Sequence, residues 1–546
     1  MVEAIKIILE RHLLSAVIFT PLLGVLWLYF IPGGSERQKL YRGITFLWSL
    51  LVFILSLLVL IRFKPSNTGF QLVENSIWID AFNVRYAVGV DGISIFLVLL
   101  TTFLMPIVIL ASHSVSKSLR GYLANMLLLE SAMLGTFLAM DLFLFYLFWE
   151  LMLFPMYFLI GIWGGPRRIY ATLKFVLYTV FGSVLMLVAI FYVVYVHYKE
   201  FGEVSFLISD LLQTVFRYRT ECILFLAFGI AFAIKVPIFP FHTWLPDAHV
   251  EAPTGGSVVL AGVLLKMGLY GFIRFGFPLF PRASEYFTPL LAVLAVVGII
   301  YGALVAWAQS DIKKLVAYSS VSHLGYCVLG FVALNSISTT GSIVQMLNHG
   351  ISTGALFLLV GVLYDRRHTR EIKEYGGLAS RLPIYAFFFL VFTLSSIALP
   401  LTNGFVGEFL ILMGSFSTMP VYVAFAVLGV ILGAIYMLTL YLKVMFGKID
   451  EKKNGALSDV TRGEIATFVP LLFMVFYIGI YPQWIISVIK PSVDHYVSWM
   501  EERRSILVMP KYAGKSGEKK AFSVSFERGT GESGADVVDA LSIKGM

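Results

Sequence analysis

The chain alternates between long apolar runs and short polar stretches over most of its length. A helix that crosses a bilayer needs about 20 predominantly apolar residues. The pattern predicts an all-α polytopic membrane protein with about 14 transmembrane helices, whereas residues 63–90 are expected to form a polar loop. The expected spans cover residues 12–31, 43–62, 91–112, 121–140, 142–163, 171–197, 221–241, 253–277, 286–308, 314–334, 340–364, 383–416, 421–446 and 464–489.

Composition and charge agree with this class of protein. Hydrophobic residues make up 58% of the chain and charged residues 14%, against roughly 25% charged residues in soluble domains. The net charge of +8 does not indicate nucleic-acid binding here, because Lys and Arg in the loops of a membrane protein first report its orientation. Loops after odd-numbered spans hold 20 Lys and Arg residues and those after even-numbered spans hold 8. This asymmetry predicts that both termini lie outside the cytoplasm.

Six ionisable residues lie at membrane depth in six different spans. They are Glu150, Lys235, Lys266, His323, His349 and Glu408. A charged side chain at the bilayer centre costs about 2.5–3.5 kcal/mol or more, and desolvated groups exchange protons closer to neutral pH than they do in water. A buried Glu–Lys pair alone could be structural, and a single histidine could simply be hydrogen-bonded. Six such groups together favour a proton path, with water joining them.

Helix-breaking residues interrupt two of the spans, and each break lies beside one of these six ionisable residues. The expected breaks lie at Pro237, Pro240, Pro400 and Gly404. A proline leaves the carbonyl four residues earlier without its partner, and lipid cannot satisfy that carbonyl. Prolines also kink ordinary helices, but matching breaks in two halves of a chain are typical of inverted-repeat transporters. We therefore expect two inverted five-helix repeats, each containing one broken helix.

This reading gives a domain organisation. We expect three N-terminal spans with the polar loop (1–112), a first repeat (121–277), a second, inverted repeat (286–446), a last span (464–489) and a polar, poorly ordered tail (490–546). Cys222 and Cys327 are the only cysteines, too few for an iron–sulfur cluster or a four-cysteine zinc site. No glycine-rich nucleotide-binding motif is present. The chain is therefore expected to hold no metal or cofactor of its own.

Three blocks of sequence resemble the antiporter-like membrane subunits of respiratory complex I, which are related to Mrp-type cation/proton antiporter subunits. The blocks are "KVPIFPFHTWLPDAHVEAPTGGSVVLAGVLLKMGLYGFIRF" (235–275), "QSDIKKLVAYSSVSHLGY" (309–326) and "MLNHGISTGALFLLVGVLYDRRHTREI" (346–372). The last block, and the glutamate in "NGFVGEFL", resemble the M-type group, whose mitochondrial counterpart is subunit 4. The resemblance covers roughly residues 80–490.

The resemblance implies roles for the six residues. Glu150 and Lys235 would form the paired charge of an input half-channel, Lys266 with His323 and His349 a central hydrated axis, and Glu408 the far connection. A close Glu150 carboxylate would hold the proton on Lys235, and its withdrawal would release it. Moving one proton against about 150 mV costs roughly 3.5 kcal/mol.

The resemblance also implies partners and an energy source. The chain would be a subunit of NADH:quinone oxidoreductase in the inner (cytoplasmic) membrane of a bacterium, beside L-type and N-type antiporter-like subunits. FMN, iron–sulfur clusters and quinone would belong to partner subunits, so their redox chemistry would drive this chain. An Mrp-type Na⁺/H⁺ antiporter subunit and a non-conducting structural subunit of the membrane arm remain open as alternatives.

Overall fold

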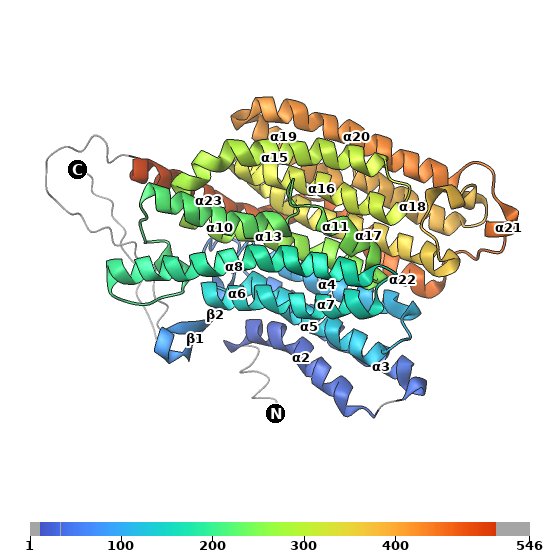
Figure 1. Cartoon of the computed structure of the whole chain (residues 1–546), viewed down its shortest axis with the longest axis horizontal. Helices are drawn as coiled ribbons and strands as arrows, with labels where there is room; N and C mark the ends of the chain where they lie inside the picture. Colours follow the sequence, from blue (N-terminus) through green and yellow to red (C-terminus); the bar gives the residue numbers. More distant parts are fainter. Residues whose placement is uncertain (1–10, 33, 509–546) are drawn as a thin grey trace.

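The structure, a computed structural model, describes residues 11–32 and 34–508. Long helices lie side by side and roughly parallel or antiparallel to one another (Figure 1). The helices before the first break are α2 (Leu13–Phe30), α3 (Gln38–Arg62), α4 (Ile95–Ala111), α5 (Leu119–Leu138), α6 (Leu142–Leu151), α7 (Leu153–Trp163), α8 (Arg168–Phe201), α9 (Ile208–Leu211) and α10 (Tyr218–Lys235). Lipid offers the backbone no hydrogen-bond partners, so apolar segments of this length bury their amides within helices.

The second half of the chain is helical in the same way. Its helices are α11 (Trp244–Glu251), α12 (Thr254–Val259), α13 (Leu265–Gly271), α14 (Phe277–Leu279), α15 (Pro281–Trp307), α16 (Ile312–Val332), α17 (Ser336–Arg367), α18 (Pro383–Ser396), α19 (Asn403–Thr418), α20 (Pro420–Met445), α21 (Glu451–Asn454), α22 (Arg462–Ile480) and α23 (Gln483–Val508). Two π-helical turns, Leu260–Leu264 and Phe272–Gly276, join α12, α13 and α14 into one span.

Within the described residues, 12 helices are long and apolar enough to cross a membrane. Two expected spans are discontinuous: α10 stops at Lys235, and a non-helical stretch separates α18 from α19. The fraction buried inside the protein distinguishes central from peripheral spans. The best-buried window is 100% buried in Thr254–Leu279 and in α17, but only 28% buried in α3. The spans that carry Lys266 and His349 are therefore central.

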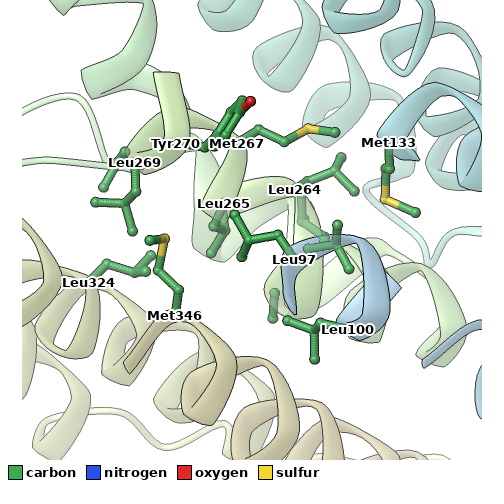
Figure 2. Packing of buried hydrophobic residues seen from close by; sticks show 14 of the residues in the cluster. Leu97, Leu100, Met133, Leu264, Leu265, Met267, Leu269, Tyr270, Leu324 and Met346 are labelled. Atoms are coloured by element: carbon green, nitrogen blue, oxygen red, sulfur yellow. The ribbon is translucent and has the colours of Figure 1, made fainter. Parts of the chain in front are cut away.

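Apolar side chains fill the space between the central helices. Figure 2 shows Leu97 and Leu100 of α4 near Leu264 and Leu265, which flank the start of α13. Leu324 of α16 lies on another side of the same span. This dense apolar packing surrounds the buried polar residues and limits where water can reach them.

Residues 63–90 correct the expectation of an all-α chain with a polar loop. They contain an antiparallel hairpin of β1 (Gln71–Ile79) and β2 (Val84–Val90), with Asn83 in a left-handed conformation at the turn. The Glu74 carboxylate accepts hydrogen bonds from the backbone N–H groups of Leu14 and Ser15, at 2.7 and 3.1 Å. A carboxylate at a helix N-terminus satisfies otherwise unpaired amides, so the hairpin holds the start of α2.

The C-terminal expectations also need correction. The expected span 464–489 ends early, because α22 ends at Ile480 and α23 begins at Gln483 after Pro482, which cannot continue a helix through its missing N–H. The expected polar tail from residue 490 is wrong for residues 490–508, which belong to α23. The rest of that tail, 509–546, lies outside the described residues.

Two aspartates occupy matching positions in the two halves. Asp141 accepts hydrogen bonds from the second and third backbone amides of α6, and Asp311 does the same for α16. Each also forms an isolated β-bridge, Asp141 with Leu207 and Asp311 with Glu371. Both bridges reach the segment that precedes a broken helix, so the two halves share this local arrangement.

Candidate functional site

Lys235 is the last residue of α10 and is 1% exposed. Its ammonium has no hydrogen-bond partner. The Nζ atom lies 5.2 Å from the ring centroid of Trp149 and 5.7 Å from that of Phe175. Aromatic faces attract a cation without accepting its proton. The site therefore places the Lys235 amine between aromatic faces, with no oxygen atom bonded to it.

The helix break after Lys235 is packed against protein. The carbonyl of Ala233, which loses its usual partner at Pro237, accepts from the N–H of Ile238 at 2.9 Å. The next carbonyl, of Ile234, accepts from the indole N–H of Trp244 at 2.9 Å. Both carbonyls are satisfied within the chain, as a break at membrane depth requires.

Glu150 is the second-to-last residue of α6, whereas Lys235 is the last residue of α10. Its side chain is half-buried, and its Oε1 atom is buried without a hydrogen-bond partner. Glu150 and Lys235 interact electrostatically, but no ion pair within 4.0 Å joins these two described residues. The structure thus brings the expected pair near each other while leaving their charged atoms apart.

Lys266 and His349 are in direct contact. Lys266 is fully buried, and its Nζ lies 2.6 Å from Nδ1 of His349. Nζ also donates to the carbonyl of Ala261, within the π-helical turn that precedes Lys266. A π-helical turn is a rare local widening of a helix that occurs often at functional sites.

His323 and Glu408 form a second contact beside the first. His323 Nδ1 lies 2.9 Å from Glu408 Oε1, which also accepts from Gln345 Nε2 at 3.0 Å. The rings of His323 and His349 are 5.9 Å apart between centroids. Four of the six expected residues therefore form one line, Lys266–His349–His323–Glu408. This line passes through α13, α17, α16 and α19 in turn.

The second break is held by a polar cluster at the start of α19. The Asn403 side chain accepts from Ser395 Oγ at 2.5 Å and donates to Ser352 Oγ at 3.2 Å. Its backbone carbonyl accepts from Asn348 Nδ2 at 2.6 Å. Pro400 lies in the non-helical stretch before α19, and a Cβ at Gly404 would lie 2.1 Å from the carbonyl oxygen of Ser395. This close packing fixes the start of the helix that carries Glu408.

His249 of α11 is a buried ionisable residue that the sequence analysis missed. It is fully buried, neither ring nitrogen has a hydrogen-bond partner, and its ring stacks on Phe357 at 4.6 Å. It interacts electrostatically with both Lys266 and Lys313. The signal was available, since His249 lies in the segment "FHTWLPDAHVEAP" (241–253), which directly follows the first break.

A cavity of about 480 Å³ is lined by Val250, the residue that follows His249, and by residues that include Glu251, Lys313 and Asp365. Lys313 is 6% exposed and donates to the carbonyl of Ala252 at 2.6 Å. The cavity is far larger than one water molecule requires. His249 is therefore one residue away from the cavity lining in sequence, and it interacts electrostatically with Lys266.

The site contains proton-exchanging groups and no cluster suited to a metal. Among the described residues, no group of three or more His, Cys, Asp or Glu side chains could hold a metal ion. Ammonium, imidazole and carboxyl groups at these distances can pass protons between one another, directly or through water. The arrangement is suited to proton movement across a protein interior.

Comparison with known proteins gives a consistent result. Residues 139–433 match the family model "NADH:quinone oxidoreductase/Mrp antiporter, TM", and residues 18–141 match "NADH-ubiquinone oxidoreductase chain 4, amino terminus". NADH-quinone oxidoreductase subunit M of Rickettsia prowazekii (strain Madrid E) is 47% identical over 89% of this chain and 99% of the relative. NADH-ubiquinone oxidoreductase chain 4 of Marchantia polymorpha is 45% identical over 89% and 97%.

Solved structures show the same fold. A chain in respiratory complex I from Thermus thermophilus with bound NADH aligns with a TM-score of 0.80 and 32% identity, covering 89% of this chain and 99% of that one. A chain in the Mrp complex from Dietzia sp. DQ12-45-1b aligns with a TM-score of 0.75 at 19% identity, covering 89% and 99%.

Proposed function

The chain belongs to the NADH:quinone oxidoreductase/Mrp antiporter family of membrane subunits, and we propose that its buried line of polar residues is its proton path. It is a proton-translocating membrane subunit of NADH:quinone oxidoreductase, in the M-type branch of the family. The single observation that supports this path most directly is the contact series Lys266–His349–His323–Glu408.

The proposed path has a loading part and a central part. Protons enter the central line through Lys235, and from the large cavity past Lys313 and His249. They leave through Glu408. His323 Nε2 lies 3.3 Å from Ser396 Oγ, so the histidine also has a hydroxyl neighbour beside this end of the path.

The separation of Glu150 and Lys235 supports a switching role for this pair. Lys235 has aromatic neighbours but no carboxylate in contact, so movement of Glu150 changes how strongly the ammonium form is stabilised. A change of one unit in a pKa corresponds to about 1.4 kcal/mol. Holding a proton against about 100 mV needs roughly 2.3 kcal/mol. Approach and withdrawal of one buried carboxylate is of the right size to gate a proton.

We also propose the finer architecture. The 12 apolar spans and the two broken ones make fourteen crossings, and residues 121–277 and 286–446 are inverted five-helix repeats between the N-terminal spans (1–112) and the last span (464–489). The matching caps and bridges of Asp141 and Asp311 support the repeat. The Lys and Arg asymmetry supports placing both termini outside the cytoplasm, in the inner membrane of a bacterium.

Partners supply the energy in this proposal. L-type and N-type antiporter-like subunits are proposed as neighbours in the membrane arm. FMN, iron–sulfur clusters and quinone are proposed to lie on partner subunits, and their redox chemistry drives the pair at Glu150 and Lys235. The Mrp-type alternative is not favoured, since the Mrp chain is 19% identical to this one and subunit M relatives reach 47%.

The test is reconstitution of the whole complex into vesicles, with electron transfer and proton translocation measured separately. Lys235→Ala is expected to abolish coupled proton translocation, while Lys490→Ala, at an exposed lysine of α23, leaves it unchanged. Normal pumping with Lys235→Ala in a fully assembled complex would refute the proposed path. Pumping that requires Na⁺ would favour the Mrp-type alternative instead.

A further inference from the structure

Glu130 of α5 is a fully buried carboxyl group with no structural partner. Its relative exposure is 0%, and both carboxyl oxygens are buried without a hydrogen-bond partner. No ion pair within the described residues includes it. It is the twelfth of 20 residues in a membrane span, so it lies near mid-depth. A charge at this depth without a partner is strongly unfavourable, so the group holds its proton in this conformation.

Every other buried carboxyl group in the described chain has such a partner. Glu74 binds backbone amides of α2, Asp91 pairs with Arg274, Asp141 caps α6, Glu221 pairs with Arg282, Glu251 accepts from the Arg167 amide, Glu408 contacts His323, and Glu464 pairs with Arg366. The hydrogen bonds of these groups offset the free-energy cost of burying them. Glu130 makes no such hydrogen bond, so the stability of the fold does not explain its presence.

The depth of Glu130 can be fixed against the central span. The Tyr122 hydroxyl of α5 lies 2.6 Å from where a Cβ of Gly255 would be, and Tyr270 donates to the Phe137 carbonyl at 3.1 Å. From the first pair to the second, the position moves 15 residues along α5 and 15 residues along the span Thr254–Leu279. The two segments therefore run parallel, with a constant offset of 133 between residues at the same depth. Glu130 is therefore level with residue 263, about 5 Å from the depth of Lys266.

The spans around Glu130 contain two features that bear on proton exchange. At its own level the parallel span has the π-helical turn Leu260–Leu264, a local feature that is frequent at functional sites. Towards the start of α5, Tyr122 lines the 480 Å³ cavity and contacts Ser112 Oγ at 3.1 Å. Towards the other end, Met133 lies across from Leu264 in apolar packing (Figure 2). Among these neighbours, Tyr122 is the one that lines a cavity large enough for water.

We propose that Glu130 is a further proton-exchanging residue of this subunit, loaded from the cavity at Tyr122 and Lys313. It holds a proton while the helices around it are closed and gives it up when they open to water during turnover. This role rests on the proposed function, since it supplies protons to the same central line. The exchange needs no other reactant, because the carboxylic acid loses H⁺ to water and the carboxylate regains it.

The test uses the whole complex reconstituted into vesicles. Glu130→Gln is expected to lower the number of protons translocated per electron, while electron transfer in the presence of an uncoupler stays at the wild-type rate. In infrared difference spectra recorded between oxidised and reduced complex, a carboxylic acid carbonyl band is expected to disappear in Glu130→Gln. Ser131→Ala, the adjacent residue that bonds the Ile18 carbonyl, is the matched control and is expected to change neither result.

Each other outcome is decisive. A normal proton-to-electron ratio, or an unchanged infrared band, in Glu130→Gln overturns the proposal. Glu130→Met removes the polar atoms at similar volume, and failure of both variants to assemble would make Glu130 structural and also overturn it. Lys235→Ala separates this proposal from the wider one. If Lys235→Ala stops pumping and Glu130→Gln does not, only the role of Glu130 fails.

Discussion

The Nζ atom of Lys266 lies 2.6 Å from Nδ1 of His349, although the two residues are 83 positions apart in the chain. An ammonium group only donates hydrogen bonds, so Nδ1 accepts this one whenever Lys266 carries its proton. The hydrogen of the neutral ring is then on Nε2, which is buried without a partner. His349 is thus positioned to take a proton at one nitrogen and release one from the other, and the ring of His323 lies 5.9 Å from it between centroids.

Replacement of His349 tests this relay. His349→Gln keeps a polar side chain but cannot gain and lose a proton, so we expect proton translocation to slow by roughly 10²-fold or more, the usual loss when a positioned proton-transfer group is removed. The measurement is the initial rate of vesicle acidification by the reconstituted complex. His495→Gln, at an exposed histidine of α23, serves as the control. Pumping at the wild-type rate in His349→Gln would rule out the relay.

Glu408→Gln separates charge from hydrogen bonding. The amide can still meet His323 and Gln345, which are 2.9 and 3.0 Å from the native Oε1, so assembly should be retained. Proton translocation should be lost, because the amide does not exchange a proton near neutral pH. Assembly is read from native gels, and pumping from a pH-sensitive dye. Glu501→Gln, at an exposed position, should change neither, and retention of pumping in Glu408→Gln would place the exit elsewhere.

Asp141 should matter for stability through its cap. It accepts from the amides of Phe143 and Leu144 at 2.9 and 3.0 Å while fully buried. Loss of a cap costs about 0.5–2 kcal/mol, so Asp141→Ala should lower the unfolding midpoint of the purified complex. Asp141→Asn keeps an oxygen that accepts both bonds and should lie close to wild type. Equal midpoints for the Ala and Asn variants would show that the cap contributes nothing.

Gly404 should tolerate no side chain. A Cβ there would lie 2.1 Å from the backbone oxygen of Ser395, which cannot move without shifting α18. We expect Gly404→Ala to destabilise the protein by about 1–3 kcal/mol, the usual effect of overpacking, and to reduce pumping by displacing the start of α19. Gly433→Ala is the matched control, since nothing lies within 4 Å of its added Cβ. The two variants are compared by thermal unfolding, and identical midpoints would contradict the prediction.

Part of the fold is readable from sequence because lipid imposes a simple rule. A helix at membrane depth must be long and apolar, so the runs of hydrophobic residues located the helices to within a few residues in most cases. The rule fails where water or protein replaces lipid. The rule did not predict the β-hairpin at 71–90 or the break between α22 and α23. Outside the bilayer, alternating polar residues or a single proline are compatible with several backbone structures.

The candidate site divides in the same way. The sequence by itself determined which ionisable residues lie at membrane depth, because burying a charge there is costly enough to make each one conspicuous. Only the tertiary structure decided which of them meet: Lys266 contacts His349 and His323 contacts Glu408, while Glu150 and Lys235 remain apart. Those contacts depend on the rotation and depth of each helix, which are set by close packing against its neighbours and not by the apolar pattern along one span.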